Sequence, residues 1–111
     1  MSEAGVHRGQ DGCLRLRGPL DLETVPALWR QGAALLGEAA GTVHDLDLAA
    51  VERTDSAGVA LLIDWTRCAR EAGGDLRLWH VPEQMLAILR ASGVESALLF
   101  AAEHESSRKV G

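Results

Sequence analysis

The strongest constraint on the fold is the alternation of two apolar patterns along the chain. Three segments, residues 13–17, 44–48 and 75–81, place apolar residues at every second position, and a helical apolar spacing follows each of them. A period of two is typical of a half-buried strand, and a period near 3.6 of an amphipathic helix. The order predicts an α/β fold, a mixed but mostly parallel β-sheet with α-helices packed on it. A length of 111 residues suits one domain over residues 1–111.

Glycine, proline and hydroxyl residues are expected to mark the ends of these elements. The dipeptide at residues 18–19, Gly-Pro, is predicted to end the first strand. Thr24 is predicted to cap the first helix, and Asp55-Ser56 to open the second. The predicted helices begin at 24, 55–56 and 82, and end at 37–41, 72 and 93.

The two ends of the chain give weaker patterns. A strand within residues 5–10 has little support, and residues 94–100 could form a last short strand or helix. From residue 101 the chain is polar and is predicted to be a frayed tail, which leaves a core over about residues 13–100.

Charge and targeting features exclude several classes of protein. The net charge is −5, and Lys109 is the one lysine beside ten arginines. This excludes a P-loop lysine, a Schiff-base lysine and the late-strand lysine of a receiver domain, and it argues against nucleic acid as a partner. The first twelve residues lack a signal-peptide pattern, and no apolar run approaches the roughly 20 residues of a membrane span. We expect a cytoplasmic protein that contacts a membrane only through a partner.

The residue types that bind metals or perform catalysis are scattered. Cys13 and Cys68 lie in apolar patterns and are expected to be buried free thiols. Asp45 and Asp47 are expected on the exposed face of a strand. The four histidines have no metal-ligand spacing and are expected to be solvated or at strand edges: His7, His44, His80 and His104. No dinucleotide motif is present either, so we predict no metal, no cofactor and no enzymatic activity.

The most informative segment is residues 51–58, VERTDSAG. It reads as the end of a strand, a short polar loop and a serine that opens a long helix. The first amides of a helix favour a serine oxygen as a cap, and they would equally favour a phosphate carried on Ser56. Both interpretations stay open, and Thr54 is a second hydroxyl nearby. Ser56 has no nucleophile-elbow motif around it, so it is a poor catalytic nucleophile.

The helix that follows Ser56 has a wider apolar arc than one sheet face needs. The surplus places either Trp65 or Ile63 near the surface, which would suit a docking face; alternatively, Trp65 packs on a neighbouring helix. The opposite side of this helix carries Ser56, Ala60, Ile63 and Arg67.

Three motifs in order resemble the STAS-domain family, the fold of anti-sigma-factor antagonists and of the regulatory domain of sulfate transporters. Residues 55–58, Asp-Ser-Ala-Gly, resemble its D-S/T-x-G signature. Residues 18–24 resemble its G-x-L-D-x-x-T segment, and residues 46–48 its L-D-L strand. The resemblance covers residues 13 to about 100 and implies the STAS fold for this chain.

Within that family, residues 27–29, 81–85 and 93–94 resemble the MlaB branch, the small cytoplasmic subunits of Mla-type phospholipid ABC transporters. This implies a non-enzymatic subunit that binds the transporter's ATPase through the helix opened by Ser56. It would stabilise or activate that ATPase and so support lipid asymmetry of the outer membrane. The predicted partner-binding residues are Asp55, Ser56, Ala57, Gly58, Ala60, Ile63, Arg67 and Asp21.

Two points stay open. Asp21 either helps to shape the partner surface, since the resemblance places an acidic residue near the signature serine, or is a turn or capping aspartate. The alternative function is that of an anti-sigma-factor antagonist switched by phosphorylation of Ser56, with an anti-sigma factor kinase as the partner.

Overall fold

The structure is a computed structural model and describes residues 4–102. Of the tail predicted for residues 101–111, residues 103–111, and with them His104, lie outside the described residues. The elements, in chain order, are β1 (Gly5–Arg8), β2 (Leu14–Leu20), α1 (Val25–Gly37), β3 (Val43–Thr54), α2 (Ser56–Glu71), β4 (Asp75–Trp79), α3 (Glu83–Ser92), the 3-10 helix η1 (Glu95–Ala97) and β5 (Leu99–Phe100).

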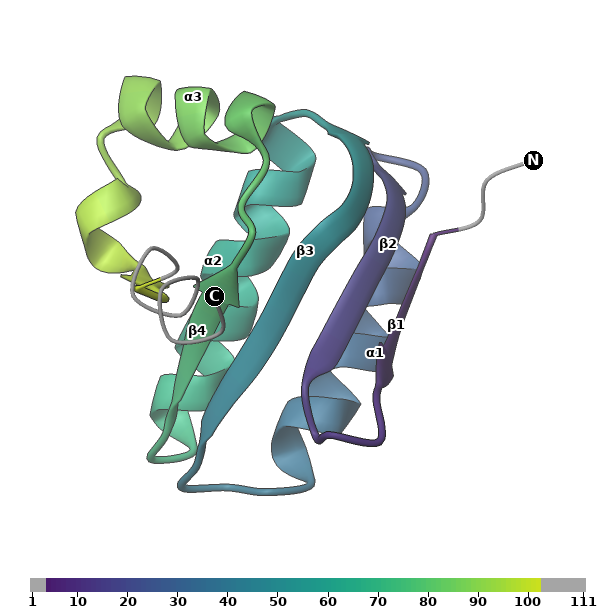
Figure 1. Ribbon diagram of the computed structural model, residues 1–111, viewed down its shortest axis with the longest axis vertical. Coiled ribbons are helices and arrows are strands. Elements are labelled where there is room, and N and C mark those ends of the chain that lie inside the picture. The colour runs from purple at the N-terminus through teal and green to yellow at the C-terminus, as the bar shows by residue number, and fades with distance from the viewer. Residues whose placement is uncertain (1–3, 103–111) are drawn as a thin grey trace, which may run out of the picture.

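One five-stranded sheet in the order β1-β2-β3-β4-β5 organises the molecule. β1 runs antiparallel to β2, and the other neighbouring strands pair in parallel. The predicted α/β fold with a mixed, mostly parallel sheet is therefore confirmed, and the weakly supported N-terminal strand exists. Figure 1 shows α1 and α2 on one face of this sheet and α3 across one end.

β2 does not end at Gly18-Pro19 as predicted, but continues to Leu20. β1 pairs with β2 only as far as Arg17, and the register with β3 shifts between Gly18 and Pro19. A proline lacks a backbone N–H and is tolerated where a strand has an open edge or an irregular register. Beyond Arg17 the β2 strand has an open edge, and its register with β3 is irregular at Pro19. The strand therefore continues through the Gly-Pro dipeptide that was predicted to end it.

β3 is longer than predicted, and the expected polar loop after residue 50 is part of the strand. The alternation of buried and exposed residues breaks at Ala49 and Ala50, which are both exposed. The register with β2 shifts at the same place, and the Ala49 amide donates to Asp47 Oδ1 at 2.9 Å. β3 therefore runs to Thr54, one residue before the cap of α2. β4 is shorter than predicted, since His80 follows it with a left-handed backbone at φ 56°.

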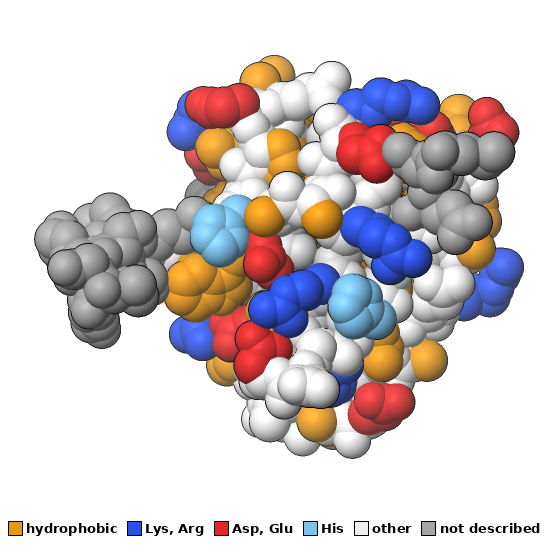
Figure 2. Space-filling model, turned by 45° about the vertical axis from the view of Figure 1, so that its right-hand side comes forward, with side chains coloured by type: hydrophobic (Ala, Val, Ile, Leu, Met, Phe, Trp, Pro, Cys, Tyr) orange, Lys and Arg blue, Asp and Glu red, His pale blue; other side chains and the backbone are white. Residues whose placement is uncertain are grey.

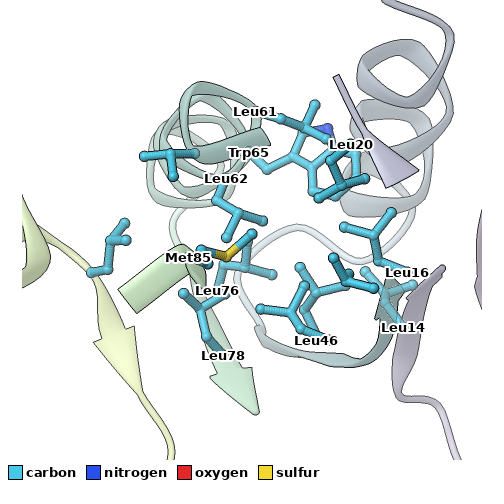
Figure 3. Packing of buried hydrophobic residues seen from close by; sticks show 14 of the residues in the cluster. Leu14, Leu16, Leu20, Leu46, Leu61, Leu62, Trp65, Leu76, Leu78 and Met85 are labelled. Atoms are coloured by element: carbon cyan, nitrogen blue, oxygen red, sulfur yellow. The ribbon is translucent and has the colours of Figure 1, made fainter. Parts of the chain in front are cut away.

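The core lies between the sheet and the helices. Leucines from β2, β3 and β4 face Leu61, Leu62 and Trp65 of α2, with Met85 beside them (Figure 3). Trp65 is 2% exposed, its Nε1 donates to Trp29 O at 3.2 Å, and its ring lies against the Cα of Gly32. Of the two interpretations, packing on a neighbouring helix is correct for Trp65.

Three smaller expectations concern single residues. Cys13 and Cys68 are free thiols as expected, although only partly buried, and burial raises the pKa of the Cys13 thiol. His44 is 5% exposed and faces the helices, so the expectation of a solvated histidine is wrong for this residue. Burial, together with the positive charge of Arg8, lowers its pKa. Within residues 4–102, no helix has the length and apolar character that crossing a membrane requires.

Candidate functional site

The start of α2 is built by Asp55, which is the N-cap of this helix. Its backbone is extended, with φ −122° and ψ −164°, and its Oδ1 accepts a hydrogen bond from the Ala57 amide at 2.8 Å. Its carbonyl accepts from the Gly58 amide at 3.1 Å, and its own amide donates to Leu20 O at 3.3 Å. The capping aspartate thus joins the ends of β2 and β3 to the first turn of α2.

Ser56 does not cap the helix; that interpretation is wrong. It is the first residue of α2, it is exposed, and its hydroxyl makes no hydrogen bond with another described residue. Thr54 differs, because it is 4% exposed and its Oγ1 donates to Asp55 O at 3.0 Å. Of the two neighbouring hydroxyls, only that of Ser56 is accessible to another protein.

Gly58 allows α2 to approach the sheet closely. A Cβ at this position would lie 2.8 Å from the Cβ of Leu20 and would overlap Oγ1 of Thr54. Gly58 is itself buried, so it positions the start of α2 and offers no surface to a partner. The spacing of the D-S-x-G motif therefore has a physical basis: the first residue caps, the second is presented, and the fourth makes room.

The outward side of α2 carries the remaining predicted docking residues. Ser56, Ala60 and Arg67 are exposed, and Ile63 is partly buried. They follow one another at helical spacing, and we call these four residues the α2 stripe. Ala57 lies beside the stripe and is partly buried. Exposed small and apolar side chains beside an arginine resemble a docking face more than a catalytic pocket.

Asp21 lies next to this site, because the Asp55 amide donates to the carbonyl of the preceding residue, Leu20. Its Oδ1 accepts from the amides of Glu23 at 2.9 Å and Thr24 at 3.0 Å, which makes it a turn aspartate. Its Oδ2 lies 3.7 Å from Nη2 of Arg53. Thr24 occupies the N-cap position of α1, but its hydroxyl donates to Pro19 O at 2.9 Å and accepts from the Asp21 amide at 3.0 Å. It caps no amide of the helix, in contrast to the prediction.

Two residues at this end of the molecule were missed by the sequence analysis. Leu22 is 81% exposed in the loop between β2 and α1, beside Asp21. An apolar residue within a polar turn segment was the available signal. Gln84 accepts a hydrogen bond from the Thr54 amide at 2.9 Å through Oε1, which ties α3 to the end of β3. A single glutamine in the first turn of a helix gives no signal of that contact.

The sheet face opposite α1 and α2 is a second, polar surface (Figure 2). Asp45 accepts from Arg77 Nε at 2.6 Å and from Trp79 Nε1 at 2.8 Å. Burial alone would raise the pKa of Asp45, but these hydrogen bonds and the charge of Arg77 lower it. Asp47 Oδ1 lies 2.9 Å from His80 Nδ1. The two aspartates thus lie on the predicted face, but partly buried and paired, beside a cavity of about 520 Å³.

The described part of the chain offers little for catalysis. No group of three or more metal-ligating side chains occurs within residues 4–102. The Ser56 hydroxyl has no hydrogen-bonded base among these residues, and a serine needs such a base to act as a nucleophile. Within the described residues, the site is an exposed surface formed by the start and the outward side of α2.

A family model described as "Mlab, STAS domain" matches residues 5–100. Solved structures match as well. The MlaB subunit of the Acinetobacter MlaFEDB complex in its ATP-bound Vtrans2 conformation aligns with a TM-score of 0.73 at 24% identity, over 86% of this chain and 98% of that one. The anti-sigma factor antagonist SpoIIAA in its unphosphorylated form aligns with a TM-score of 0.68 at 19% identity, over 97% and 96% of the two chains.

A third structure is the anti-sigma-factor antagonist (STAS) domain protein from Planctomyces limnophilus, with a TM-score of 0.73 at 17% identity, over 93% of this chain and 95% of that one. No curated protein matches by sequence. Identities this low establish the shared fold and leave the function to be argued from the site.

Proposed function

Because this chain belongs to the STAS-domain family, with the MlaB-type domain matching residues 5–100, we propose that it is a non-enzymatic subunit that binds the ATPase of a phospholipid ABC transporter. Docking uses the start of α2 and the α2 stripe, and it stabilises or activates the ATPase in a transporter that maintains outer-membrane lipid asymmetry. On this proposal the protein is cytoplasmic and meets the membrane only through the transporter.

The observation that carries the proposal is the presentation of Ser56. The cap of Asp55 and the close approach at Gly58 hold the first turn of α2 rigidly, while the Ser56 side chain is exposed and unengaged within the described residues. Rigid presentation lowers the conformational entropy that binding costs. The likeness in fold to the MlaB subunit of a transporter complex supports the choice of partner.

The test is binding of the purified chain to the ATPase subunit of the transporter encoded with it, by gel filtration and calorimetry. Ser56→Arg places a long charged side chain at the centre of the surface and should abolish the complex. Ser92→Arg, at an exposed serine in the last turn of α3, is the matched control and should bind like the parent. A complex that survives Ser56→Arg with unchanged affinity would overturn the proposed interface.

A second candidate function is an anti-sigma-factor antagonist that is switched by phosphorylation of Ser56. Two observations favour it: the exposed hydroxyl stands at the N-terminus of a 16-residue helix, and SpoIIAA shares the fold. A phosphate adds about −1.5 to −2 charge at pH 7. It would stand beside the carboxylates of Asp55 and Asp21, so repulsion would alter the docking surface.

The measurement for this candidate is intact-mass spectrometry after incubation with an anti-sigma factor kinase and ATP. One added phosphate on the parent, and none on Ser56→Ala, is the expected outcome. The buried Thr54 should remain unmodified. A parent chain that gains no mass in the presence of an active kinase would rule the candidate out.

A further inference from the structure

The loop between β2 and α1 presents a leucine to solvent. Leu22 is 81% exposed, although the turn around it is closely hydrogen-bonded. Oδ1 of Asp21 accepts from the amides of Glu23 at 2.9 Å and Thr24 at 3.0 Å. The Thr24 hydroxyl in turn donates to Pro19 O at 2.9 Å and accepts from the Asp21 amide at 3.0 Å. These bonds hold the backbone on both sides of Leu22, so burial of its side chain by a partner costs little further backbone entropy.

The side of α1 that follows this loop is also apolar. A single exposed leucine is ordinary on a protein surface, but here it does not stand alone. Pro26, Trp29 and Ala33 follow one another at spacings of three and four residues and therefore lie on one side of α1. Pro26 is exposed, and Trp29 is 39% exposed. The loop and the first turns of α1 thus carry three exposed apolar residues, Leu22, Pro26 and Trp29, which we call the α1 strip.

The α1 strip borders α2. The carbonyl of Trp29 points along α1 toward the amide of Ala33, four residues later, as in any α-helix. This carbonyl accepts a hydrogen bond from Nε1 of Trp65, a residue of α2, at 3.2 Å. α2 therefore contacts α1 on the side that carries Trp29 and Ala33, and the exposed part of the Trp29 ring lies at the junction of the two helices.

The beginning of the α1 strip also lies near the beginning of α2. Leu22 is two residues from Leu20, whose carbonyl accepts a hydrogen bond from the amide of Asp55 at 3.3 Å. Ser56 follows Asp55 directly. Consecutive Cα atoms are about 3.8 Å apart, whereas an interface of standard size covers about 800 Å² on each partner, or about 32 Å across for a round patch. A partner centred on Ser56 therefore also reaches Leu22.

The carboxylates at this junction indicate the charge of the occupant. Asp21 lies 3.7 Å from Arg53, so these two charges largely offset each other. Glu23 and Asp55 are exposed, and neither forms an ion pair with another described residue. Their negative charges disfavour an anionic lipid surface as the occupant and favour a protein face that carries arginine or lysine.

We propose that the partner ATPase that docks on α2 also covers the α1 strip, with Leu22 and Trp29 as apolar anchors. Aliphatic or aromatic side chains of the ATPase pack on these two residues, and basic side chains beside them pair with Glu23 and Asp55. Tryptophan is enriched among the interface residues that contribute most of the binding energy. This inference rests on the proposed docking function and specifies the chemistry of the partner's face at the same site.

The first test removes the apolar anchors one at a time in the full chain. Leu22→Ala and Trp29→Ala should each weaken binding to the ATPase subunit about fivefold or more, as measured by calorimetry. Leu22→Ala should leave the urea unfolding midpoint unchanged, because its side chain is already 81% exposed in the free protein. Circular dichroism establishes that Trp29→Ala is folded. Parent-like affinity of Leu22→Ala would overturn the proposal.

Val43→Ala is the matched control for the loss of an exposed apolar side chain. Val43 is 50% exposed and is the first residue of β3, whereas the docking site adjoins Thr54, the last residue of that strand. The variant should bind like the parent. A loss of affinity as large as that of Leu22→Ala would mean that the effect is not confined to the α1 strip, and would contradict the proposal.

The second test addresses the charge of the partner. Affinity of the parent chain for the ATPase subunit should fall as the salt concentration rises, because salt screens pairs between exposed charges. Glu23→Gln should weaken this dependence on salt. Glu38→Gln, at the other end of α1, is the control and should leave it unchanged. An unchanged salt dependence of Glu23→Gln, or tighter binding by this variant, would contradict a basic partner face.

Comparison with Ser56→Arg separates this proposal from the docking function. If Ser56→Arg abolishes binding but Leu22→Ala and Trp29→Ala bind like the parent, the α1 strip is not covered and the docking function stands. If the ATPase subunit does not bind the parent chain, both proposals fail. Two other results would identify a different occupant and overturn the proposal: a dimer of the free chain that Leu22→Ala dissociates, or binding to phosphatidylglycerol vesicles that Leu22→Ala abolishes.

Discussion

Asp55, Ser56 and Gly58 lie within four residues, and the structure gives each a separate task. The carboxylate of Asp55 satisfies an amide of the first helical turn, so Ser56 need not cap and its hydroxyl stays available. The absence of a side chain at Gly58 lets this turn lie against Leu20 and Thr54. The exposure of Ser56 therefore depends on two neighbouring residues, the capping Asp55 and the buried Gly58.

Gly58→Ala tests the steric part of this arrangement. The new Cβ would overlap Oγ1 of Thr54 and press on Leu20, and overpacking of this kind costs about 1–3 kcal/mol of unfolding free energy. Gly37→Ala at the end of α1 is the control, since a Cβ there meets nothing within 4 Å and should stabilise by about 0.4–1 kcal/mol. Urea unfolding of both variants gives the comparison. Equal stabilities for the two variants would contradict the close approach at Gly58.

At the scale of elements, the pairing of α1 with α2 depends on Gly32 and Trp65. The indole ring occupies the position of a side chain that Gly32 lacks, and Nε1 donates to the carbonyl of Trp29. α2 is thereby held with its apolar arc inward and the α2 stripe outward. The orientation of the docking surface follows from this helix–helix contact.

A double-mutant cycle measures that contact. Gly32→Ala should destabilise the protein by about 1–3 kcal/mol, because the added methyl group collides with the indole ring. In the background of Trp65→Leu the same change should cost much less, which gives a coupling energy of about 1–3 kcal/mol. Additive effects in urea unfolding would show that the two residues do not interact in the way described.

β3 contributes a dependence of stability on pH through His44. Burial and the charge of Arg8 lower its pKa below the ordinary value of 6.5, whereas Asp45 acts in the opposite direction. The unfolded chain then takes up the proton first, so His44 contributes stability that is fully present above pH 6.5 and is lost as the pH falls.

The free energy of unfolding should therefore decrease from pH 7 to pH 5, and His44→Leu should make this decrease smaller. Urea titrations at several pH values measure both slopes. Identical slopes for the parent and the variant would mean that His44 does not bind its proton differently in the two states.

The sequence predicted the order and type of the main elements, because their apolar periods are regular. The predicted strand ends were wrong where the alternation of buried and exposed residues is interrupted or the register is irregular. Ala49 and Ala50 interrupt the alternation of β3, and Pro19 lies inside β2 at an irregular register. The site was located from the signature, but the capping role of Asp55, the exposure of Leu22 and the contact from Gln84 depend on how separate elements meet. Such contacts have no local pattern in the sequence.

At the scale of the whole molecule, two different surfaces flank the core. The outward side of α2 is a small strip with an accessible serine. The open face of the sheet carries carboxylates that already have partners in Arg77, Trp79 and His80. A partner that docks on the α2 stripe meets one exposed pair, Arg67 with Asp64, whereas one that docks on the open face would have to compete with several partly buried pairs.

The most direct measurement of the central claim is methyl cross-saturation by NMR in the complex with the partner ATPase. The account predicts that the methyl signals of Ala60 and Ile63 on α2 lose intensity. Val43, which is 50% exposed at the cavity of the open sheet face, should keep its intensity. Loss of intensity at Val43, with Ala60 and Ile63 unaffected, would place the partner on the opposite face and contradict the account.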